Sequence, residues 1–173
     1  MTTASGTPAP ATPAVRHPFR LVALPFDLFE LLRSLGDAEL RARGVQRMRA
    51  DEKPGFPCRV SLADAEVGEE VWLLPFAHHD VASPYRSSGP IFVRVDAVAA
   101  RPGVNEVPAM IRTRLLSIRA YDADGTLIDS QVAEGRELEA HIERAFSDPR
   151  VAYLHLHNAR PGCFNCRVER GSV

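Results

Sequence analysis

The sequence predicts a single α+β domain, a mostly antiparallel sheet with two to three helices packed on it. Residues 113–121 and 126–133 are strand-like and are joined by Asp-Ala-Asp-Gly, a strong hairpin turn. Residues 151–158 and 164–168 form a second predicted hairpin around a Pro-Gly turn. Few segments have helical spacing, so crossover helices between parallel strands are scarce, and hairpins should dominate the sheet.

The first half of the predicted domain alternates strands with short helices. Apolar residues at 26, 29, 32 and 35, widened by Leu28 and Leu31, predict a core-facing helix that ends at Gly36. Asp37 is a typical N-cap for a second short helix, over 38–43. Strands are predicted at 19–24, 45–50, 58–62 and 71–76, and the last, which is almost continuously apolar, should be central.

The second half begins with a long predicted loop over 77–90 and an alternating strand over 91–95. A Pro/Gly-containing loop then leads to the first hairpin. After it, Leu138, Ile142 and Phe146 recur on one face of a predicted helix over 137–146. The chain ends in the second hairpin.

Composition excludes several classes of protein. The 21 basic and 22 acidic residues nearly cancel, so the chain lacks the positive charge that nucleic acid or an anionic membrane surface would attract. No apolar stretch approaches the length of a membrane span, and the N-terminus does not resemble a secretion signal. Three cysteines, an odd number, favour free thiols and a cytoplasmic location. Nothing in the sequence indicates an oligomeric state.

The first 17 residues are rich in Pro, Ala and Thr and carry no charge before Arg16. Such a segment cannot bury enough apolar surface to offset the loss of chain entropy on folding. We therefore expect a disordered tail over 1–17 and the single domain over 18–173.

The C-terminal hairpin has the densest set of chemically capable side chains. His155 and His157 lie on one face of its first strand, and Cys163 and Cys166 follow in a Cys-x-x-Cys spacing. Two thiolates and two imidazoles are a typical zinc ligand set, although this order and spacing match no common zinc finger. A redox Cys-x-x-Cys pair is an alternative, but no room remains for the usual following helix. In a third interpretation all four residues are structural.

The predicted loop over 77–90 is the second candidate site. It contains two adjacent histidines, His78 and His79, and a group of side chains suited to binding a small anionic ligand: Ser83, Tyr85, Arg86 and Ser88. Arginine can hold a carboxylate or phosphate through two parallel hydrogen bonds, and long loops on a rigid sheet often carry binding residues. Alternatively, the Ser, Pro and Gly residues only shape turns and Arg86 pairs with a surface acid.

A metal-free enzyme is the rival hypothesis. Cys58 follows a proline where a loop meets a strand, and it would act as a nucleophile or redox thiol with His78 as its base. A lone buried cysteine is the plainer interpretation. A non-catalytic ligand-binding module remains the third possibility, so the sequence does not decide whether the protein is an enzyme.

Three separated motifs carry a resemblance to a known family. They are Cys-Arg-Val-Ser-Leu at 58–62, Ser-Pro-Tyr-Arg-Ser-Ser-Gly-Pro-Ile-Phe-Val at 83–93, and His-Leu-His-Asn-Ala-Arg-Pro-Gly-Cys-Phe-Asn-Cys-Arg-Val at 155–168. In this order they resemble the bacterial family DUF1203, over roughly 19–170. The resemblance implies one soluble domain and supplies no catalytic residue. It also implies that His78 is the family's histidine before the Ser-Pro-Tyr-Arg motif and His79 a variable neighbour.

Overall fold

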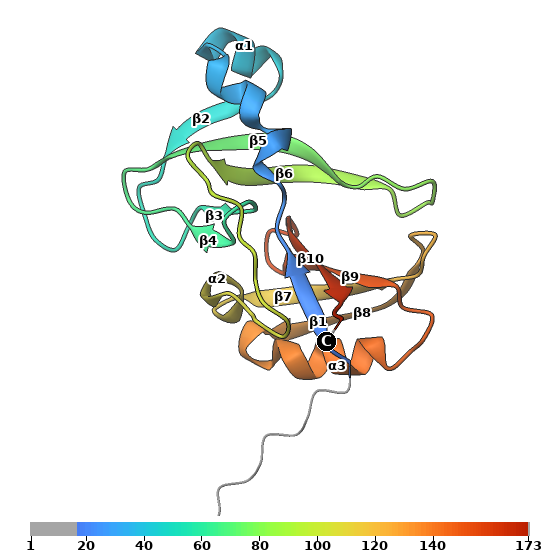
Figure 1. Cartoon of the computed structure of the whole chain (residues 1–173). Coiled ribbons are helices and arrows are strands. Elements are labelled where there is room, and N and C mark those ends of the chain that lie inside the picture. Colours follow the sequence, from blue (N-terminus) through green and yellow to red (C-terminus); the bar gives the residue numbers. More distant parts are fainter. Residues whose placement is uncertain (1–16, 173) are drawn as a thin grey trace, which may run out of the picture.

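The protein folds into two five-stranded sheets, which lie one above the other in Figure 1. The computed structural model describes residues 17–172, so the expected tail over 1–17 lies outside the described residues except for His17. Nearly all strand pairs are antiparallel, and three α-helices accompany them. The predicted single-domain α+β class is confirmed, with its strands divided between two sheets.

The lower sheet contains both predicted hairpins. Its strands, in spatial order, are β1 (Phe19–Val22), β10 (Phe164–Arg170), β9 (Tyr153–Asn158), β7 (Leu115–Tyr121) and β8 (Leu127–Glu134). Every pair in this sheet is antiparallel. Gly125 and Gly162 close the two hairpins with φ of 78° and 76°, a conformation that side chains disfavour. The central strand β9 is buried at every position.

The upper sheet is built from the middle of the chain. Its strands, in spatial order, are β2 (Gln46–Arg49), β5 (Glu70–His79), β6 (Ser87–Arg94), β3 (Pro57–Cys58) and β4 (Ala63–Asp64). β3 pairs with β6 in parallel, and the other pairs are antiparallel. β5 is an interior strand, as its continuous apolar sequence predicts.

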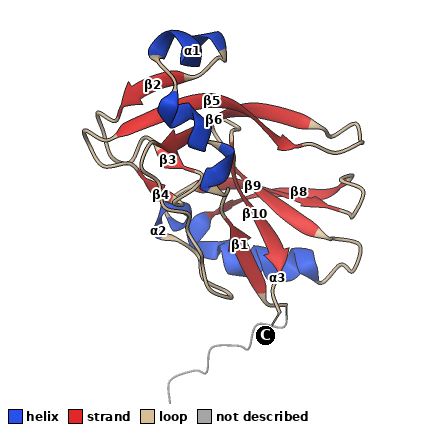
Figure 2. Cartoon of the chain, turned by 45° about the horizontal axis from the view of Figure 1, so that its top comes forward, coloured by secondary structure: helices blue, strands red, loops and turns tan. Residues whose placement is uncertain are grey.

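Helices cover the two sheets (Figure 2). The helical segments are η1 (Phe26–Leu28), η2 (Glu30–Ser34), α1 (Asp37–Ala42), α2 (Ala109–Arg112), η3 (Gly135–Glu137) and α3 (Leu138–Phe146). α3 lies beneath the lower sheet and α1 above the upper sheet (Figure 1). No helix within 17–172 is both long and apolar enough to cross a membrane.

Each sheet packs against helical segments through a cluster of buried apolar side chains. One cluster joins Leu154 and Leu156 of β9 to Leu138 and Ile142 of α3. A second cluster joins Trp72 and its neighbours on β5 and β6 to the N-terminal helical segments. The region where the sheets face each other is different, since it contains buried histidine, tyrosine and arginine side chains.

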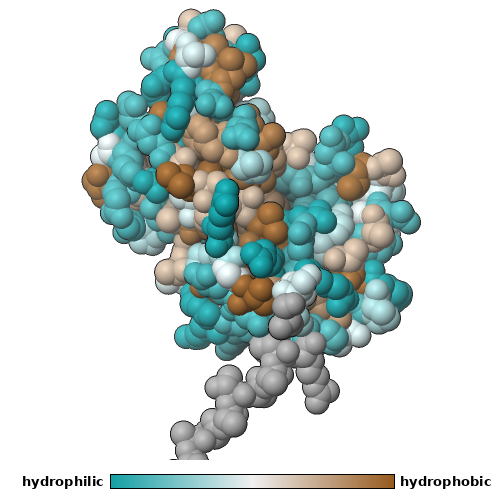
Figure 3. Space-filling view, viewed as in Figure 1, coloured by the Kyte–Doolittle hydropathy of each residue, from teal (hydrophilic) through white to brown (hydrophobic). Residues whose placement is uncertain are grey.

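Four local predictions differ from the structure. The segment expected to form one helix over 26–35 consists of two short 3₁₀ turns, and Leu28 and Leu31 are 58% and 60% exposed, not core-facing. Hydrophobic patches are visible over this upper part of the molecule (Figure 3). The strand expected over 58–62 is only the two-residue β3, and α2 was not expected at all. The loop over 77–90 is shorter than expected, because β5 continues to His79 and β6 begins at Ser87.

The packing of β9 on α3 leads to a stability prediction. Replacing the fully buried Leu154 by alanine should destabilise the protein by about 2–5 kcal/mol, because it removes apolar contacts and leaves a cavity. Val132 is 60% exposed, so Val132→Ala should change the free energy of unfolding by no more than about 0.5 kcal/mol. Urea denaturation measures both. Equal small effects would mean that β9 is not packed as described.

Candidate metal centre

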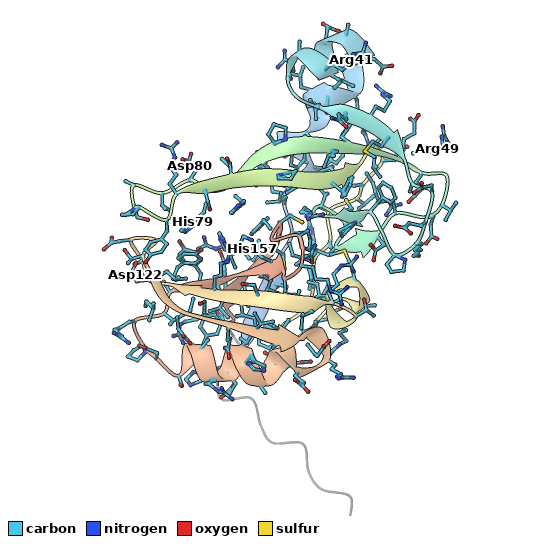
Figure 4. All side chains as sticks on the ribbon, turned by 180° about the vertical axis from the view of Figure 1, so that it is seen from behind. Arg41, Arg49, His79, Asp80, Asp122 and His157 are labelled. Atoms are coloured by element: carbon cyan, nitrogen blue, oxygen red, sulfur yellow. The ribbon has the colours of Figure 1, made fainter. Side chains whose placement is uncertain are left out.

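Strand β9 presents two histidines toward the other sheet. Leu154 and Leu156 belong to the aliphatic core beneath the lower sheet, so the alternating residues Tyr153, His155 and His157 lie on the opposite face. All three are buried. Figure 4 shows His157 of the lower sheet and His79 at the end of β5 in the space between the two sheets.

A β-bulge in β5 brings both of its histidines to this space. Phe76 pairs with Gly89 and His79 with Ser87, so β5 has one more residue than β6 between these pairs. In a regular strand the adjacent His78 and His79 would project to opposite faces, and a bulge changes that direction. The His78 ring lies 5.0 Å from that of His157, and the His79 ring lies 5.0 Å from that of His155.

Three of these histidines form a group that could hold a metal ion. One ring nitrogen from each of His78, His155 and His157 lies within 4.8 Å of the other two. Each ring also has a buried nitrogen without a hydrogen-bond partner: Nδ1 of His78, Nδ1 of His155 and Nε2 of His157. Buried polar atoms in proteins are nearly always partnered, so an unpartnered nitrogen on each of three neighbouring rings requires an explanation.

These imidazoles are neutral near pH 7. Burial, with a smaller contribution from neighbouring positive charges, lowers the pKa of His78 and His157 to about 4 and that of His155 to about 2. A neutral imidazole has one nitrogen lone pair, which is the form that binds metals. His157 Nδ1 lies 2.9 Å from the Gly162 carbonyl oxygen, so Nδ1–H donates there and the lone pair is on Nε2.

His79 is excluded from the group by its hydrogen bonds. Its Nδ1 lies 2.8 Å from the Tyr85 carbonyl oxygen and its Nε2 lies 2.8 Å from the Tyr153 hydroxyl. The carbonyl can only accept, so Nδ1–H donates to it and Nε2 accepts from the phenol. Both nitrogens of His79 are therefore used, whereas His78 has a free one and stacks on the Phe164 ring at 5.2 Å.

The cysteines of the predicted zinc set are not part of this group. Cys166 pairs with Leu156 across the hairpin and belongs to the aliphatic core, whereas Arg167 pairs with His155. Cys166 is thus on the opposite face of the sheet from the histidines, and burial raises the pKa of its thiol. Cys163 lies in the turn, with its Sγ 3.9 Å from Asn158 Nδ2. Among the described residues, the group that could hold a metal therefore contains His78 from the other sheet and neither of the two expected cysteines.

Cys58 is poorly placed for the nucleophile proposed from the sequence. It is 0% exposed, and its Sγ accepts hydrogen bonds from the backbone amides of Ser61 and Arg94. Within the described residues no hydrogen bond joins Cys58 to His78. A nucleophile must be able to reach a substrate. Because Cys58 is fully buried, the structure favours its interpretation as a structural residue.

The residues expected to bind a small ligand are only partly brought together. Tyr85 and Arg86 line a cavity of about 450 Å³, and Arg86 also forms an ion pair with Asp80 at 2.7 Å. The Ser83 hydroxyl is used in the turn, where it donates to the Gly125 carbonyl oxygen at 2.9 Å. Ser88 is exposed and does not line the cavity.

Arg119, Tyr121 and Tyr153 also belong to this region, and the sequence did not predict them as site residues. Arg119 and Tyr121 of β7 line the same cavity, and Tyr153 holds His79. The alternation of β7 does place Arg119 and Tyr121 on one face of that strand. What the sequence could not show is the pairing of β7 with β9, which sets Arg119 beside His155.

The fold and the three histidines define an α+β protein with a candidate metal centre between two sheets. Comparison with known proteins places the chain in a family. The sequence model of a family described as "Protein of unknown function (DUF1203)" matches residues 55–170, which include all three histidines. The chain belongs to this family. No curated protein and no solved structure matches it.

The three neutral histidines, of which His155 and His157 are buried and His78 is half-buried, lead to a pH prediction for protein kept free of metal by a chelator. Unfolded histidine has a pKa near 6.5, above the folded values of about 4, 2 and 4 for His78, His155 and His157. Below pH 6.5 the unfolded chain therefore binds protons that the folded chain does not. Stability should be fully present above pH 6.5 and fall as the pH drops to 4.5, by at most about 1.4 kcal/mol per pH unit for each histidine.

Histidines dominate the window of pH 4.5 to 6.5, because the stabilising contribution of a carboxylate such as Glu69, whose pKa is lowered from 4.5, is lost mainly as the pH falls below about 4.5. Urea denaturation at several pH values measures the slope. The variant His155→Gln should have a smaller slope, since it removes one of the titrating groups. A slope that is absent, or that His155→Gln leaves unchanged, would contradict the burial of neutral imidazoles.

Proposed function

We propose that the protein binds one zinc ion through His78, His155 and His157. The observation that carries the proposal is the convergence of three ring nitrogens, one from each histidine, within 4.8 Å of one another, together with a buried unpartnered nitrogen on each ring. Imidazole nitrogens bind zinc at about 2.0–2.1 Å, so an ion placed among the three would draw the rings slightly closer together and bind one nitrogen of each.

The number and type of ligands support zinc with an open position. Three neutral histidines are the ligand set of several catalytic zinc sites, whereas structural sites usually have four protein ligands. Zinc bound in this way lowers the pKa of a water molecule in its fourth position and polarises a bound oxygen. The hydrogen bond from His157 Nδ1 to the Gly162 carbonyl is the kind of outer contact that fixes a metal-binding imidazole.

The location of the protein forms part of the same proposal. All three cysteines are free, and Cys58 and Cys166 are buried. Free buried thiols persist most readily in a reducing compartment. This supports the cytoplasm as the place where the protein acts.

Zinc titration of metal-free protein by isothermal calorimetry tests the proposal. The wild type should bind about one zinc per chain. Each of His78→Gln, His155→Gln and His157→Gln should weaken binding by about 100-fold or more, since changes to the outer contacts of metal ligands alone cost 10–100-fold. Zinc at 100 times its Kd should also stabilise the wild type by about 2.7 kcal/mol through mass action.

Two matched variants serve as controls. His141 lies on α3 and its Nδ1 contacts Gln131, so His141→Gln should leave the zinc affinity unchanged. Cys163→Ser should also leave it unchanged, which separates the three-histidine site from one that uses the cysteine. Circular dichroism checks that each variant is folded. The proposal fails if the wild type binds no zinc, or if Cys163→Ser weakens binding as much as the histidine variants do.

A further inference from the structure

A cavity of about 450 Å³ adjoins the candidate metal centre. Residues of β7 and β8 form one side of it, and the loop between β5 and β6 forms the other. The residues used below are Tyr85, Arg86, Ser117, Arg119, Tyr121 and Ser130. This volume is within the range typical of small-molecule sites.

The register of the lower sheet ties this cavity to the histidines. On β7, Ser117 pairs with His157 and Arg119 pairs with His155. Directly paired residues have Cβ atoms about 4.5–5.5 Å apart and project to the same face of the sheet. The cavity and the histidine group are therefore neighbours, with Arg119 between them.

The chemistry of the cavity is suited to an anion. The residues that line it include two arginines, two tyrosines and three serines, and no acidic residue. Arg86 is already paired with Asp80, but within 17–172 no ion pair joins Arg119 to an acidic side chain. Arg119 lies near Tyr121, and its charge opposes the rise that burial causes in the pKa of that phenol. The positive charge of Arg119 therefore lies beside a cavity that no acidic residue lines.

Two effects on pKa agree with this arrangement. After burial, the charge of Arg119 is the next cause that lowers the pKa of His78, and it also contributes to lowering that of His157. This agrees with the strand pairing, which sets Arg119 beside His155 at the candidate metal centre. Burial raises the pKa of Tyr121, so its phenol stays protonated near neutral pH and can donate a hydrogen bond to a ligand.

We propose that the cavity binds a small molecule through its carboxylate or phosphate group, with the Arg119 guanidinium as the main anchor. The inference rests on the proposed zinc site in one respect, since the ion would supply a second positive charge beside Arg119. Serine and tyrosine hydroxyls would complete the contacts to the oxyanion. A planar guanidinium matches both groups, because it can donate two parallel hydrogen bonds to either.

Titration of ¹⁵N-labelled protein, followed by its amide NMR signals, tests this proposal with two probes, acetate and inorganic phosphate. Sodium chloride at matched ionic strength is the control for simple screening. Both the zinc-loaded and the metal-free protein are titrated after their zinc content has been measured. At least one probe should shift the signals of residues 117, 119 and 130 with saturation, and the two titrations show which oxyanion is preferred.

Arg119→Gln should raise the Kd for that probe by about tenfold or more, because it removes a charge-assisted pair of hydrogen bonds. Arg119→Lys keeps the charge but loses the planar pair of donors, so its Kd should be intermediate. The matched control is Arg112→Gln on α2, an arginine that pairs with Glu139 away from the cavity, and its Kd should equal that of the wild type.

The outcomes separate the two proposals. Zinc binding without any probe binding, or with a Kd that Arg119→Gln leaves unchanged, overturns the anion site while the zinc site stands. Probe binding that depends on Arg119, in a protein that takes up no zinc when zinc is supplied, upholds the anion site and refutes the zinc site. Tighter probe binding in the zinc-loaded protein than in the metal-free protein is expected if both proposals hold.

Discussion

The constraint on which the rest of the structure depends is the position of three uncharged histidines between two sheets, each with one buried ring nitrogen that has no hydrogen-bond partner. An unsatisfied buried polar group costs about 1–3 kcal/mol, and a domain is typically stable by only about 5–15 kcal/mol. Three ring nitrogens without partners, on His78, His155 and His157, therefore represent a large destabilising contribution. A bound cation that all three coordinate would convert this cost into a favourable interaction. This argument supports the proposal that the three histidines bind a cation.

The surrounding structure holds the histidines in place from both sheets. His79 of β5 hydrogen-bonds with the Tyr153 hydroxyl of β9, and Arg59 Nε donates to the Phe164 carbonyl oxygen of β10 at 2.8 Å. These contacts connect the upper part of the molecule to the lower sheet, and the His78 ring stacks on Phe164. Strands and cross-sheet hydrogen bonds give a site the rigid positions that metal coordination requires. The cavity beside Arg119 lies next to this candidate metal centre.

Local patterns were enough to predict most strands, but not how the sheets face each other. Alternation along β7 to β10 and the turns at Gly125 and Gly162 depend on neighbouring residues, so the sequence contains that information. The meeting of His78 with His157 depends on a bulge in β5 and on the contact between two sheets, neither of which has a local signal. The sequence predicted that Cys166 shares a metal site with the histidines. Closeness in sequence suggested a shared site, but pairing with Leu156 turns this residue into the core.

The most direct test of the metal centre is anomalous diffraction at the zinc absorption edge from crystals of zinc-loaded protein. This measurement locates the ion and identifies its ligands without depending on any activity. We expect one peak per chain, bounded by ring nitrogens of His78, His155 and His157 at about 2.0–2.1 Å. A peak at Cys163 or Cys166, or no peak in the space between the two sheets, would contradict the three-histidine site.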